Sequence, residues 1–340
     1  MTDLNKPIID QFELLIEQIK HDIDIAPNRK EALKHSFRLK QIKNALDVIK
    51  KYPKKIESGK QLAGYAGIGK GTMSRIDEIL TTGKLKEVSI KKKHMEVEKH
   101  IEELEQIFGI GRKKAYELVT TYNIKSITDL KKAHMAGKIE LTDQMMTSLK
   151  HHNNYKQQIP RSEMDLVNSL IQKLAPDIDP KIMVKICGSY RREKPTSNDI
   201  DILVTHPDII TKKQLMNNAV NYLRLFVQKL KDEKFILDDL THENYETKYM
   251  GYCRLRLDYP TRRIDIYYIP YESYYAALLH LTGSGNFNRK MRALAGNLGY
   301  KLNEYGLFKI KNGKMIRVKV SSEKDIFDEL GMDYIEPKDR

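Results

Sequence analysis

Three aspartates on two predicted strands are the side chains of this sequence best suited to metal-dependent chemistry. Asp199 and Asp201 lie in the segment Asp199-Ile-Asp-Ile-Leu-Val-Thr205, whose alternation predicts a strand with both carboxylates on one face. Two carboxylates side by side on a buried strand repel each other, and a bound cation relieves that repulsion. An edge strand with two solvated acids is the alternative, but the apolar run after Asp201 indicates a strand that enters a core. The pair therefore predicts a divalent metal site.

A third carboxylate is needed to hold a metal ion that activates an attacking hydroxyl group. Asp265 is the candidate, because it is a single acid between β-branched residues in the predicted strand Arg263-Ile-Asp-Ile-Tyr-Tyr-Ile-Pro270. Oxygen ligands favour Mg²⁺, with Mn²⁺ as a substitute, and no cluster of histidines and cysteines near these positions supports zinc. Two Mg²⁺ ions would lower the pKa of a primer 3′-hydroxyl and stabilise a leaving pyrophosphate, which predicts nucleotidyl transfer.

A Gly-Ser pair upstream of the aspartates could hold the phosphates of such a substrate. Gly188 and Ser189 are expected to open a turn into a helix, where backbone N–H groups and the Ser189 hydroxyl meet an anion. Arg192 could add a charge-assisted contact to the same phosphates. The segment from Gly188 to Asp201 therefore predicts a phosphate site beside the metal site.

A Gly-Ile-Gly sequence occurs twice in the N-terminal half, at Gly67–Gly69 and again 42 residues later at Gly109–Gly111. Such a hairpin between two helices lets backbone N–H groups approach a phosphate, and the following helix adds its positive N-terminal end. A single copy would be no more than a turn. Two copies in a basic chain predict paired helix-hairpin-helix elements that hold a DNA backbone without reading its sequence.

The composition also points to a polyanionic partner. Lysine and arginine number 60 against 46 aspartates and glutamates, which gives a formal charge of +14 and a pI near 9.4. Nucleic acid is the commonest partner of such a chain, although an anionic membrane or solubility alone could account for the excess. The two cysteines, Cys187 and Cys253, cannot form a disulfide framework, which favours a reducing compartment.

No stretch of the sequence is apolar and long enough for a membrane span, and no signal-like segment follows the N-terminus. We therefore expect a soluble intracellular protein without a membrane partner. The nucleus and a viral or cytoplasmic replication site remain open as compartments.

The elements that must position these residues change in type along the chain. Apolar residues at helical spacing predict helices over about 1–90 and again over about 95–150. From Ile186 onward the segments alternate or run apolar as strands do, and the tail from about 274 to 340 mixes helix with short strands around a hairpin turn at Asn312–Gly313. The predicted fold class is multidomain, all-α first and α+β afterwards.

The order of motifs resembles family X DNA polymerases, and the beta type most closely. The shared segments run nearly from end to end: Lys51-Tyr-Pro-Lys-Lys-Ile-Glu-Ser-Gly59, Ile76-Asp-Glu-Ile79, Thr82-Gly-Lys-Leu85, Ile159-Pro-Arg161, the Gly188–Asp201 motif, Arg262-Arg-Ile-Asp-Ile266, Leu281-Thr-Gly-Ser284, Asn303-Glu-Tyr305 and Ser322-Glu-Lys-Asp-Ile-Phe-Asp328. With no BRCT-like segment before residue 1, we expect the short form of the family.

The resemblance implies a domain layout and a function. It implies a lyase-type, 5′-phosphate-binding helical domain with the first hairpin over 1–92 and a DNA-gripping subdomain with the second hairpin over 93–156. A catalytic nucleotidyltransferase palm over 157–270 and a nascent base-pair subdomain over 271–340 follow. The implied function is gap-filling synthesis in base excision repair by a monomer. Its substrates would be dNTPs and gapped or nicked double-stranded DNA with a 5′-phosphate, and other repair proteins could be partners.

The resemblance also implies roles for single residues. Asp199, Asp201 and Asp265 would be the catalytic metal ligands. The other implied contacts are those to the nucleotide by Ser189, Arg192, Asn198, Gly283 and Asn288, with His280 as a further candidate, and those to DNA by Gly67, Gly69, Gly109, Gly111, Arg263, Arg289 and Arg292. Main-chain carbonyls of Ala63, Tyr65 and Ile68, and of Glu105, Ile107 and Ile110, would hold Na⁺ or K⁺ at the two hairpins.

The N-terminal domain departs from the family pattern where a lysine forms a Schiff base with a 5′-deoxyribose phosphate. Arg75 occupies that position, and a guanidinium stays protonated and cannot act as the amine nucleophile. Gly71 replaces a supporting lysine, and Ile42 replaces a tyrosine. Lys70 is the candidate substitute. The open alternatives are a domain that only binds the 5′-phosphate and a lyase that uses Lys70.

The nucleotide pocket departs from the pattern as well. His280 and Leu281 replace a Tyr–Phe pair, Gly285 replaces an acidic residue, and Tyr267 replaces an arginine on the third catalytic strand. Gln158 stands where an arginine usually supports the triphosphate. In the family the aromatic pair and the arginine help to couple closure to assembly of the metal site, so we expect a looser switch and altered fidelity.

Two rival functions share part of these features. A template-independent nucleotidyltransferase, such as a tRNA-terminal or poly(A) enzyme, has the same Gly-Ser and Asp-x-Asp core but needs no paired hairpins. A DNA-end-binding scaffold would keep the hairpins and lose the catalytic acids, whereas all three aspartates are present.

Overall fold

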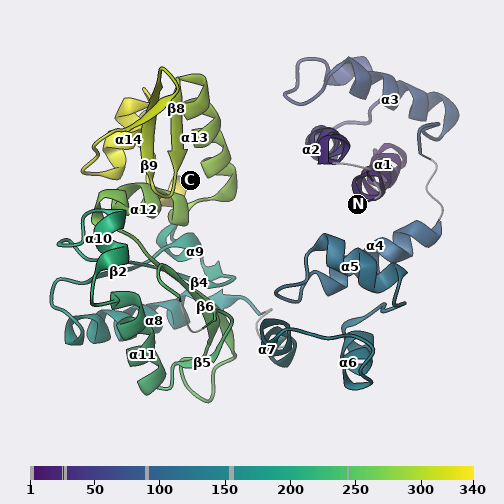
Figure 1. The fold of residues 1–340 in the computed structure, drawn as a ribbon. Coiled ribbons are helices and arrows are strands. Elements are labelled where there is room, and N and C mark those ends of the chain that lie inside the picture. Colours follow the sequence, from purple (N-terminus) through teal and green to yellow (C-terminus); the bar gives the residue numbers. More distant parts are fainter. Residues whose placement is uncertain (1–3, 25, 27–28, 89–91, 153–156, 243–244) are drawn as a thin grey trace. The chain divides into compact units, whose positions relative to one another are not determined.

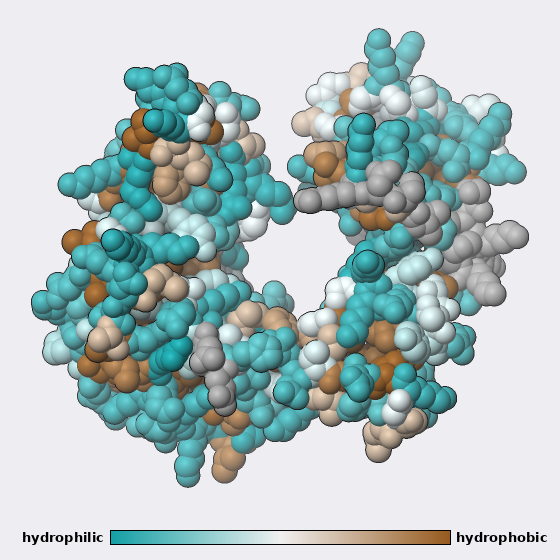
Figure 2. Space-filling view, in the orientation of Figure 1, coloured by the Kyte–Doolittle hydropathy of each residue, from teal (hydrophilic) through white to brown (hydrophobic). Residues whose placement is uncertain are grey.

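The computed structural model describes residues 4–24, 26, 29–88, 92–152, 157–242 and 245–340. The chain forms two compact units, Met1–Glu140 and Leu141–Arg340, which are coloured purple to blue and teal to yellow in Figure 1. No helix within the described ranges combines the length and the apolar character needed to cross a membrane. The visible face of each unit is mostly hydrophilic, with hydrophobic residues in small patches (Figure 2).

The first unit is helical throughout its described part, as its sequence predicts. Its first half contains α1 (Lys6–Asp24), α2 (Arg29–Lys51), the 3₁₀ helix η1 (Gly59–Leu62) and α3 (Lys70–Thr82). Apolar residues recur at three-to-four spacing on α1 and α2 and pack into one core, which includes Phe12, Leu15, Ile19, Ile42, Ala45 and Ile49. The side chain of Ile42, which replaces a tyrosine of the family pattern, belongs to this core and is 3% exposed.

The second half of this unit contains α4 (Lys92–Leu104), α5 (Arg112–Thr120) and α6 (Ile127–Met135). Arg112, the first residue of α5, joins this half to α1. Its guanidinium donates two hydrogen bonds of 2.9 Å to the Asp24 carboxylate and one of 2.6 Å to Glu98 on α4. Lys20 on α1 forms a second ion pair across the same boundary, 2.7 Å from Glu102.

The two Gly-Ile-Gly sequences have the same backbone conformation. Gly67 and Gly109 have φ values of 93° and 89°, in a region that favours glycine, and Gly69 and Gly111 then begin α3 and α5 from an extended conformation. The hydrogen bonds also correspond. The N–H of Ile68 donates to the Tyr65 carbonyl at 3.0 Å, and the N–H of Ile110 donates to the Ile107 carbonyl at 2.9 Å. The predicted internal repeat is therefore a repeat of structure.

The second unit is built on a five-stranded sheet in the order β2-β4-β7-β6-β5. The strands are β2 (Met183–Ile186), β4 (Ile200–Thr205), β5 (Ile236–Asp239), β6 (Lys248–Cys253) and β7 (Arg262–Tyr268). Strands β4 and β7 run parallel, and their other pairings are antiparallel. The strands β1 (Ile159–Pro160) and β3 (Thr196–Ser197) form a separate, short antiparallel sheet.

The central strand β4 has two different faces. Ile200, Ile202 and Val204 point into the main core of the unit, which also contains residues of the helices α8 (Arg161–Leu174) and α11 (Tyr222–Asp232). On the opposite face, Asp201 is half-buried and Leu203 is buried in a smaller core with residues of α12 (Tyr274–Thr282). The sheet therefore presents its carboxylates at one end of a face whose other end is covered by apolar packing.

The C-terminal part combines helices with a three-stranded sheet in the order β10-β9-β8. Its elements are α12 (Tyr274–Thr282), α13 (Gly285–Asn297), β8 (Tyr300–Asn303), β9 (Gly306–Lys311), β10 (Lys314–Arg317) and α14 (Glu323–Glu329). The predicted turn at Asn312–Gly313 joins β9 to β10, with φ values of 51° and 74°. The remaining elements of the unit are α7 (Asp143–His151), α9 (Gly188–Arg191), α10 (Lys212–Asn217) and the 3₁₀ helices 175–177, 271–273 and 337–339.

Helix α7 lies in the second unit, although the sequence places it before the expected boundary at 156/157. Lys150 and His151 at its C-terminal end are 2.8 and 2.6 Å from the Asp238 carboxylate of β5. Gln144 donates a 2.7 Å hydrogen bond to the Leu240 carbonyl. The compact units thus divide at 140/141. Residues 153–156, at the expected boundary, and 89–91, beside the other one at 92/93, lie outside the described residues.

Candidate active site

The parallel pairing of β4 with β7 brings two of the predicted aspartates together. Asp201 and Asp265 are direct partners in the register of the two strands, and Asp199 lies immediately before β4. Each strand alternates between core and open face, so Ile200 pairs with Ile264 in the core while the two acids share the opposite face. Asp201 and Asp265 therefore lie side by side at one end of these neighbouring strands, and Asp199 is close enough to repel both.

The electrostatics of this cluster are those of crowded negative charge. Burial, followed by repulsion from Asp199 and Asp265, raises the pKa of Asp201 to about 7. Asp199 is exposed when the whole residue is considered, but its carboxyl group is partly desolvated by its neighbours. This desolvation, and then the negative charge of Asp265, raise the pKa of Asp199. Both shifts indicate that the cluster is short of positive charge.

Two cations meet the third carboxylate. The Arg263 guanidinium donates a 2.5 Å hydrogen bond to Asp265, and the Lys248 ammonium lies 3.7 Å from its other oxygen. In the part of the chain that the structure describes, no three acidic, histidine or cysteine side chains converge closely enough to hold a metal ion. The chemistry of the donors nevertheless suits a hard divalent cation, because the three ligands supply only oxygen and two of them have raised pKa values.

The Gly188 turn lies directly against the carboxylates. Gly188 has a φ of 58°, and a Cβ atom at this position would lie 2.9 Å from an Asp201 carboxylate oxygen, so any other residue would be strained and would displace that carboxylate. The predicted helix that follows is α9, a single turn of four residues. Its Ser189 hydroxyl donates a 2.8 Å hydrogen bond to the hydroxyl of Ser197. The turn thus places its backbone amides and a hydroxyl group next to Asp201.

Arg192 connects this turn to the C-terminal part of the unit. Its guanidinium donates a hydrogen bond to the Thr282 carbonyl, and its buried Nε atom has no hydrogen-bond partner among the described residues. Burial lowers the pKa of Arg192, and the charge of Asp201 only partly opposes this effect. A cation that is short of acceptors beside the carboxylates is suited to an anionic substrate group.

A second set of predicted residues lies at the junction of α12 and α13. Gly283 ends α12 with a φ of 69°, and an added Cβ atom would be 3.3 Å from the Arg192 guanidinium. Asn288 donates a 2.7 Å hydrogen bond to the His280 carbonyl, and Arg292 donates to the His280 ring at a distance of 3.1 Å from Nδ1. The structure therefore brings Gly283, His280, Asn288 and Arg292 together.

Two predicted contact residues remain on the surface. Asn198 is exposed in the loop before Asp199, and Arg289 is exposed on α13, where it donates to the Asn286 side chain. Gln158, at the position of a family arginine, accepts a 2.9 Å hydrogen bond from the Thr196 hydroxyl. None of these side chains has a hydrogen bond to the carboxylate cluster in the part of the chain that the structure describes.

Comparisons with known proteins agree with this arrangement. A profile described as DNA polymerase beta palm matches residues 158–271, one described as DNA polymerase beta thumb matches residues 277–340, and a helix-hairpin-helix domain profile matches residues 4–85. Over 99% of its length the chain is 32% identical to a DNA polymerase lambda of Arabidopsis thaliana, and over 87% it is 30% identical to that of Rattus norvegicus. The chain belongs to family X of the DNA polymerases.

The chain spans 62% and 51% of the lengths of these two relatives. A DNA nucleotidylexotransferase of Xenopus laevis is 25% identical over the whole chain, which spans 69% of that protein. The predicted membership of family X and the predicted order of helical, palm and C-terminal parts are confirmed. The special likeness to the short beta form stays a prediction.

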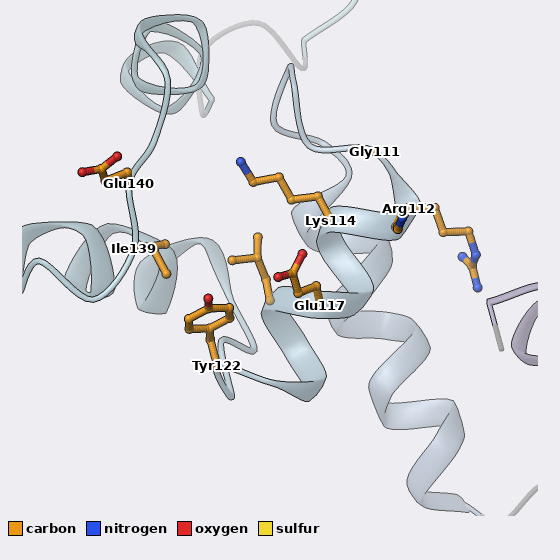
Figure 3. Close-up of a pocket in the computed structure, with 9 residues that line it drawn as sticks. Gly111, Arg112, Lys114, Glu117, Tyr122, Ile139 and Glu140 are labelled. Atoms are coloured by element: carbon orange, nitrogen blue, oxygen red, sulfur yellow. The ribbon is translucent and has the colours of Figure 1, made fainter.

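In the hairpins of this family X protein, some of the carbonyl groups expected to bind monovalent cations already accept hydrogen bonds. The carbonyls of Tyr65 and Ile107 already accept the hydrogen bonds that close each hairpin. Beside the second hairpin is a pocket of about 710 Å³, in which Lys114 points inward and Arg112 points away toward its acidic partners (Figure 3). Arg112 and Lys114, two of the three cations that follow Gly111, thus lie in different surroundings.

The lyase-type region has an ion pair at the position of the family nucleophile. Arg75 donates two hydrogen bonds to Glu87, and Arg38 donates a third at 2.6 Å. Partial burial alone would raise the pKa of Glu87, but the hydrogen bonds and charges of Arg75 and Arg38 lower it. Lys70 is exposed at the start of α3, and five residues correspond to about 140° around a helix, so Lys70 and Arg75 lie on different faces.

Sequence reasoning missed several residues that surround the family X site. Lys248 reaches Asp265 only because β6 pairs with β7, and its position carries no signal in the sequence. Arg191 donates to Thr282 at 2.6 Å and to Glu323 on α14 at 2.6 and 3.0 Å. The adjacent arginines Arg191 and Arg192 were visible in the sequence, but the sequence does not show which of them binds Glu323.

Proposed function

We propose that this protein is a DNA-directed DNA polymerase that fills short gaps in double-stranded DNA during base excision repair. The observation that carries the proposal is the register pairing of Asp201 with Asp265 beside the Gly188 turn. This arrangement supports transfer of a nucleotidyl group, and the two phosphate-binding hairpins in the other unit support a DNA substrate.

Asp199, Asp201 and Asp265 are proposed to hold Mg²⁺, or Mn²⁺ in its place, with two ions per site. When bound, these ions supply charge neutralisation for the attacking hydroxyl and the leaving pyrophosphate. The chain's own residues bind and orient the substrates. The Ser189 hydroxyl, the amides of its turn and Arg192 would hold the triphosphate, with Asn198 at the edge of the site.

The α12–α13 junction is proposed to position the incoming nucleotide. Gly283 leaves room for the sugar, because a side chain there would meet Arg192. Asn288, oriented by its hydrogen bond to the His280 carbonyl, would read the minor-groove edge of the new base. His280 is a further contact candidate, and Arg289 and Arg292 would touch the template. Arg263 would reach DNA only after leaving Asp265.

The N-terminal unit is proposed to grip DNA through backbone groups. The glycines of the two hairpins, Gly67, Gly69, Gly109 and Gly111, allow close approach to phosphates. Na⁺ or K⁺ would bind carbonyls of Ala63, Tyr65 and Ile68, and of Glu105, Ile107 and Ile110. We further propose the four-part layout with boundaries near 92, 156 and 270, a monomeric state, and work inside the cell alongside other repair proteins.

Templated synthesis is tested with a one-nucleotide gap that carries or lacks a 5′-phosphate. We expect incorporation of the complementary dNTP only, faster with the phosphate, and no extension of a single strand without template. Asp265→Ala should lower the rate at least about a hundredfold, since even outer partners of a metal site are worth 10–100-fold. Equal extension without template would support the template-independent rival, and an active Asp265→Ala protein would contradict the mechanism.

The lyase reaction is proposed to be lost, while the region keeps its affinity for a 5′-phosphate. Arg75 cannot form a Schiff base, and Lys70 lies on a different face of α3. Borohydride trapping on an incised abasic site measures this directly. We expect no covalent adduct with the wild-type protein, and an adduct that disappears in Lys70→Ala would overturn the proposal.

A further inference from the structure

A cavity of about 310 Å³ is lined by residues from the end of β7, the start of β6, α10 and α12. Its volume is within the range of small-molecule pockets, about 300–1,000 Å³. Lys248, which contacts Asp265, is one of its lining residues, and we call it the Lys248 cavity. It lies entirely within the second unit.

The charged groups of the Lys248 cavity are predominantly positive. The Lys248 ammonium lies 4.7 Å from the centre of the Tyr267 ring, and the Lys212 ammonium lies 5.9 Å from the centre of the Tyr305 ring. No ion pair joins Lys212 to another residue in the described ranges. The lining carboxylate, Glu304, is 3.4 Å from the Arg292 guanidinium and is therefore partly neutralised. A ligand of this cavity should carry negative charge.

The walls of the cavity are apolar and aromatic. Leu215 is 5% exposed and Ala277 is 1% exposed, and Leu281 adds a further aliphatic side chain. The Lys248 and Lys212 ammonium groups lie over the rings of Tyr267 and Tyr305, which also line the cavity. Flat aromatic walls favour a planar ligand, because stacking on a ring adds to the burial of apolar surface.

His280 supplies one hydrogen-bond donor to this lining. Its Nδ1 atom faces two donors, the Arg292 guanidinium at 3.1 Å and the Asn288 amide at 3.3 Å, so it must act as the acceptor. The ring proton therefore lies on Nε2. Burial, and then the charge of Arg292, lower the pKa of His280 and keep the ring neutral. The donor on Nε2 remains available.

We propose that the Lys248 cavity binds a small planar anion of the nucleoside monophosphate class. The cavity shares His280 with the proposed site of the incoming nucleotide, but Ser189 and Arg192, which would hold the triphosphate, are not among its lining residues. The two ammonium groups would bind the phosphate, and the tyrosine rings would bind the base. Three positions where this sequence departs from the family pattern, Tyr267, His280 and Leu281, all line this one cavity. The bound phosphate would compete with Asp265 for Lys248 and thereby reach the catalytic cluster.

The test is equilibrium binding of deoxyadenosine 5′-monophosphate to the full chain, measured by calorimetry in EDTA without DNA. We expect a single saturable site with a dissociation constant below about 1 mM, and weaker binding of deoxyadenosine and of inorganic phosphate. Lys212→Ala and Lys248→Met should each weaken binding about tenfold, which corresponds to one lost charge-assisted contact. Leu281→Trp should fill the cavity and abolish binding, and Leu257→Trp, at an 87% exposed position, is its matched control.

Arg192→Ala separates this site from the triphosphate site. Binding that persists in Arg192→Ala and weakens in Lys212→Ala supports the proposal. Binding lost in Arg192→Ala and unchanged in Lys212→Ala places the nucleotide at the triphosphate site and overturns it. Absence of saturable binding to the wild-type chain also overturns it. Lys212 is exposed, so its substitution tests the site even where the tryptophan variant fails to fold.

Discussion

The two hairpins of the N-terminal unit share one backbone but differ in the side chain that begins the following helix. At the first hairpin this residue is Lys70, which is exposed. At the second it is Arg112, whose guanidinium binds Asp24 and Glu98. Because the phosphate contacts of such a hairpin come from backbone amides, the side chain at this position is free to serve another purpose. In the second hairpin the Arg112 side chain connects α5 to α1 and α4 through Asp24 and Glu98.

The comparison also changes how the net charge should be understood. The formal charge of +14 counts Lys70 and Arg112 equally. Arg112 is neutralised inside the protein by carboxylates that are 5% and 8% exposed, so it contributes little to an outside field. At the second hairpin the cation available to DNA is therefore not Arg112 but the exposed Lys113 that follows it.

Removal of Arg112 should have the largest effect. Arg112→Ala leaves Asp24 and Glu98 without their cation, and we expect a loss of about 3 kcal/mol in the free energy of unfolding, the lower end for a broken buried pair. Urea unfolding of the full chain, followed by exchange of amide hydrogens in α1 and α5, measures this. Arg75→Ala is the matched control at the first hairpin, where the half-exposed pair with Glu87 should cost below about 1 kcal/mol. Equal losses would remove the distinction between the hairpins.

Substitution of the central glycines should have equal effects at both hairpins. Gly67→Ala and Gly109→Ala place a side chain at φ values of 93° and 89°, which should cost about 1–2 kcal/mol each. Gly69→Ala is the control, because its φ is −103° and an added Cβ atom meets nothing within 4 Å. The melting temperature is expected to fall at the first two positions only. DNA affinity should fall in all three variants, because Gly69 is also proposed to approach a phosphate. Tolerance of alanine at one hairpin alone would mean that the repeat is not a functional pair.

The salt dependence of DNA binding should show that each hairpin contributes an exposed lysine. Lys70→Ala removes an exposed cation, and the slope of log K against log salt should become shallower by about 0.9. Lys113→Ala, at the exposed position after Arg112, should give a similar change at the second hairpin. Binding of gapped DNA measured by fluorescence anisotropy between low and moderate salt checks both values. An unchanged slope in both variants would place the DNA elsewhere on the unit.

Acid should act in opposite directions at the two hairpins, and this is the smallest effect. The pKa of Glu87 is lowered by its arginines, so its contribution to stability is present above its ordinary pKa of 4.5 and is lost as pH falls further. Burial raises the pKa of Asp24 from 3.8 despite Arg112, so the folded state holds that proton more tightly and stability rises as pH falls toward the raised value.

The measurement is hydrogen exchange at several pH values, corrected for intrinsic rates. Protection in α3 should decline below about pH 4.5, while protection in α1 near Asp24 should not decline over the same window. Glu87→Gln should remove the decline in α3. A parallel decline of both regions in that variant would assign the acid sensitivity to other groups.

The sequence was sufficient where a local pattern decides the structure. The alternation around Asp199 and Asp201 predicted a strand with its acids on one face and its isoleucines in a core. In β4, Ile200 and Ile202 point into the main core and Asp201 lies on the opposite face. The 42-residue repeat predicted two equal hairpins, because glycine at a positive φ is a local requirement. The turn at Asn312–Gly313 was predicted for the same reason.

The sequence was insufficient where distant segments meet. Lys248 contacts Asp265 through strand pairing, and Arg112 contacts Asp24 across 88 positions of the chain. A cation on a helix surface looks the same in the sequence whether it binds solvent or an internal acid. For the same reason α7 gave no sign that it packs on β5, because its apolar spacing suits either unit.

Gly188 is a position where the diversity of residues that survive a selection can be predicted from the backbone and the neighbouring carboxylate. Any other residue at this codon would combine backbone strain at a φ of 58° with a Cβ atom 2.9 Å from an Asp201 oxygen. In a library selected for DNA synthesis, codon 188 should therefore strongly favour glycine, whereas codon 296, where an added Cβ atom meets nothing within 4 Å, should accept small residues. The ratio of diversity at these two codons would report the stringency of the selection itself.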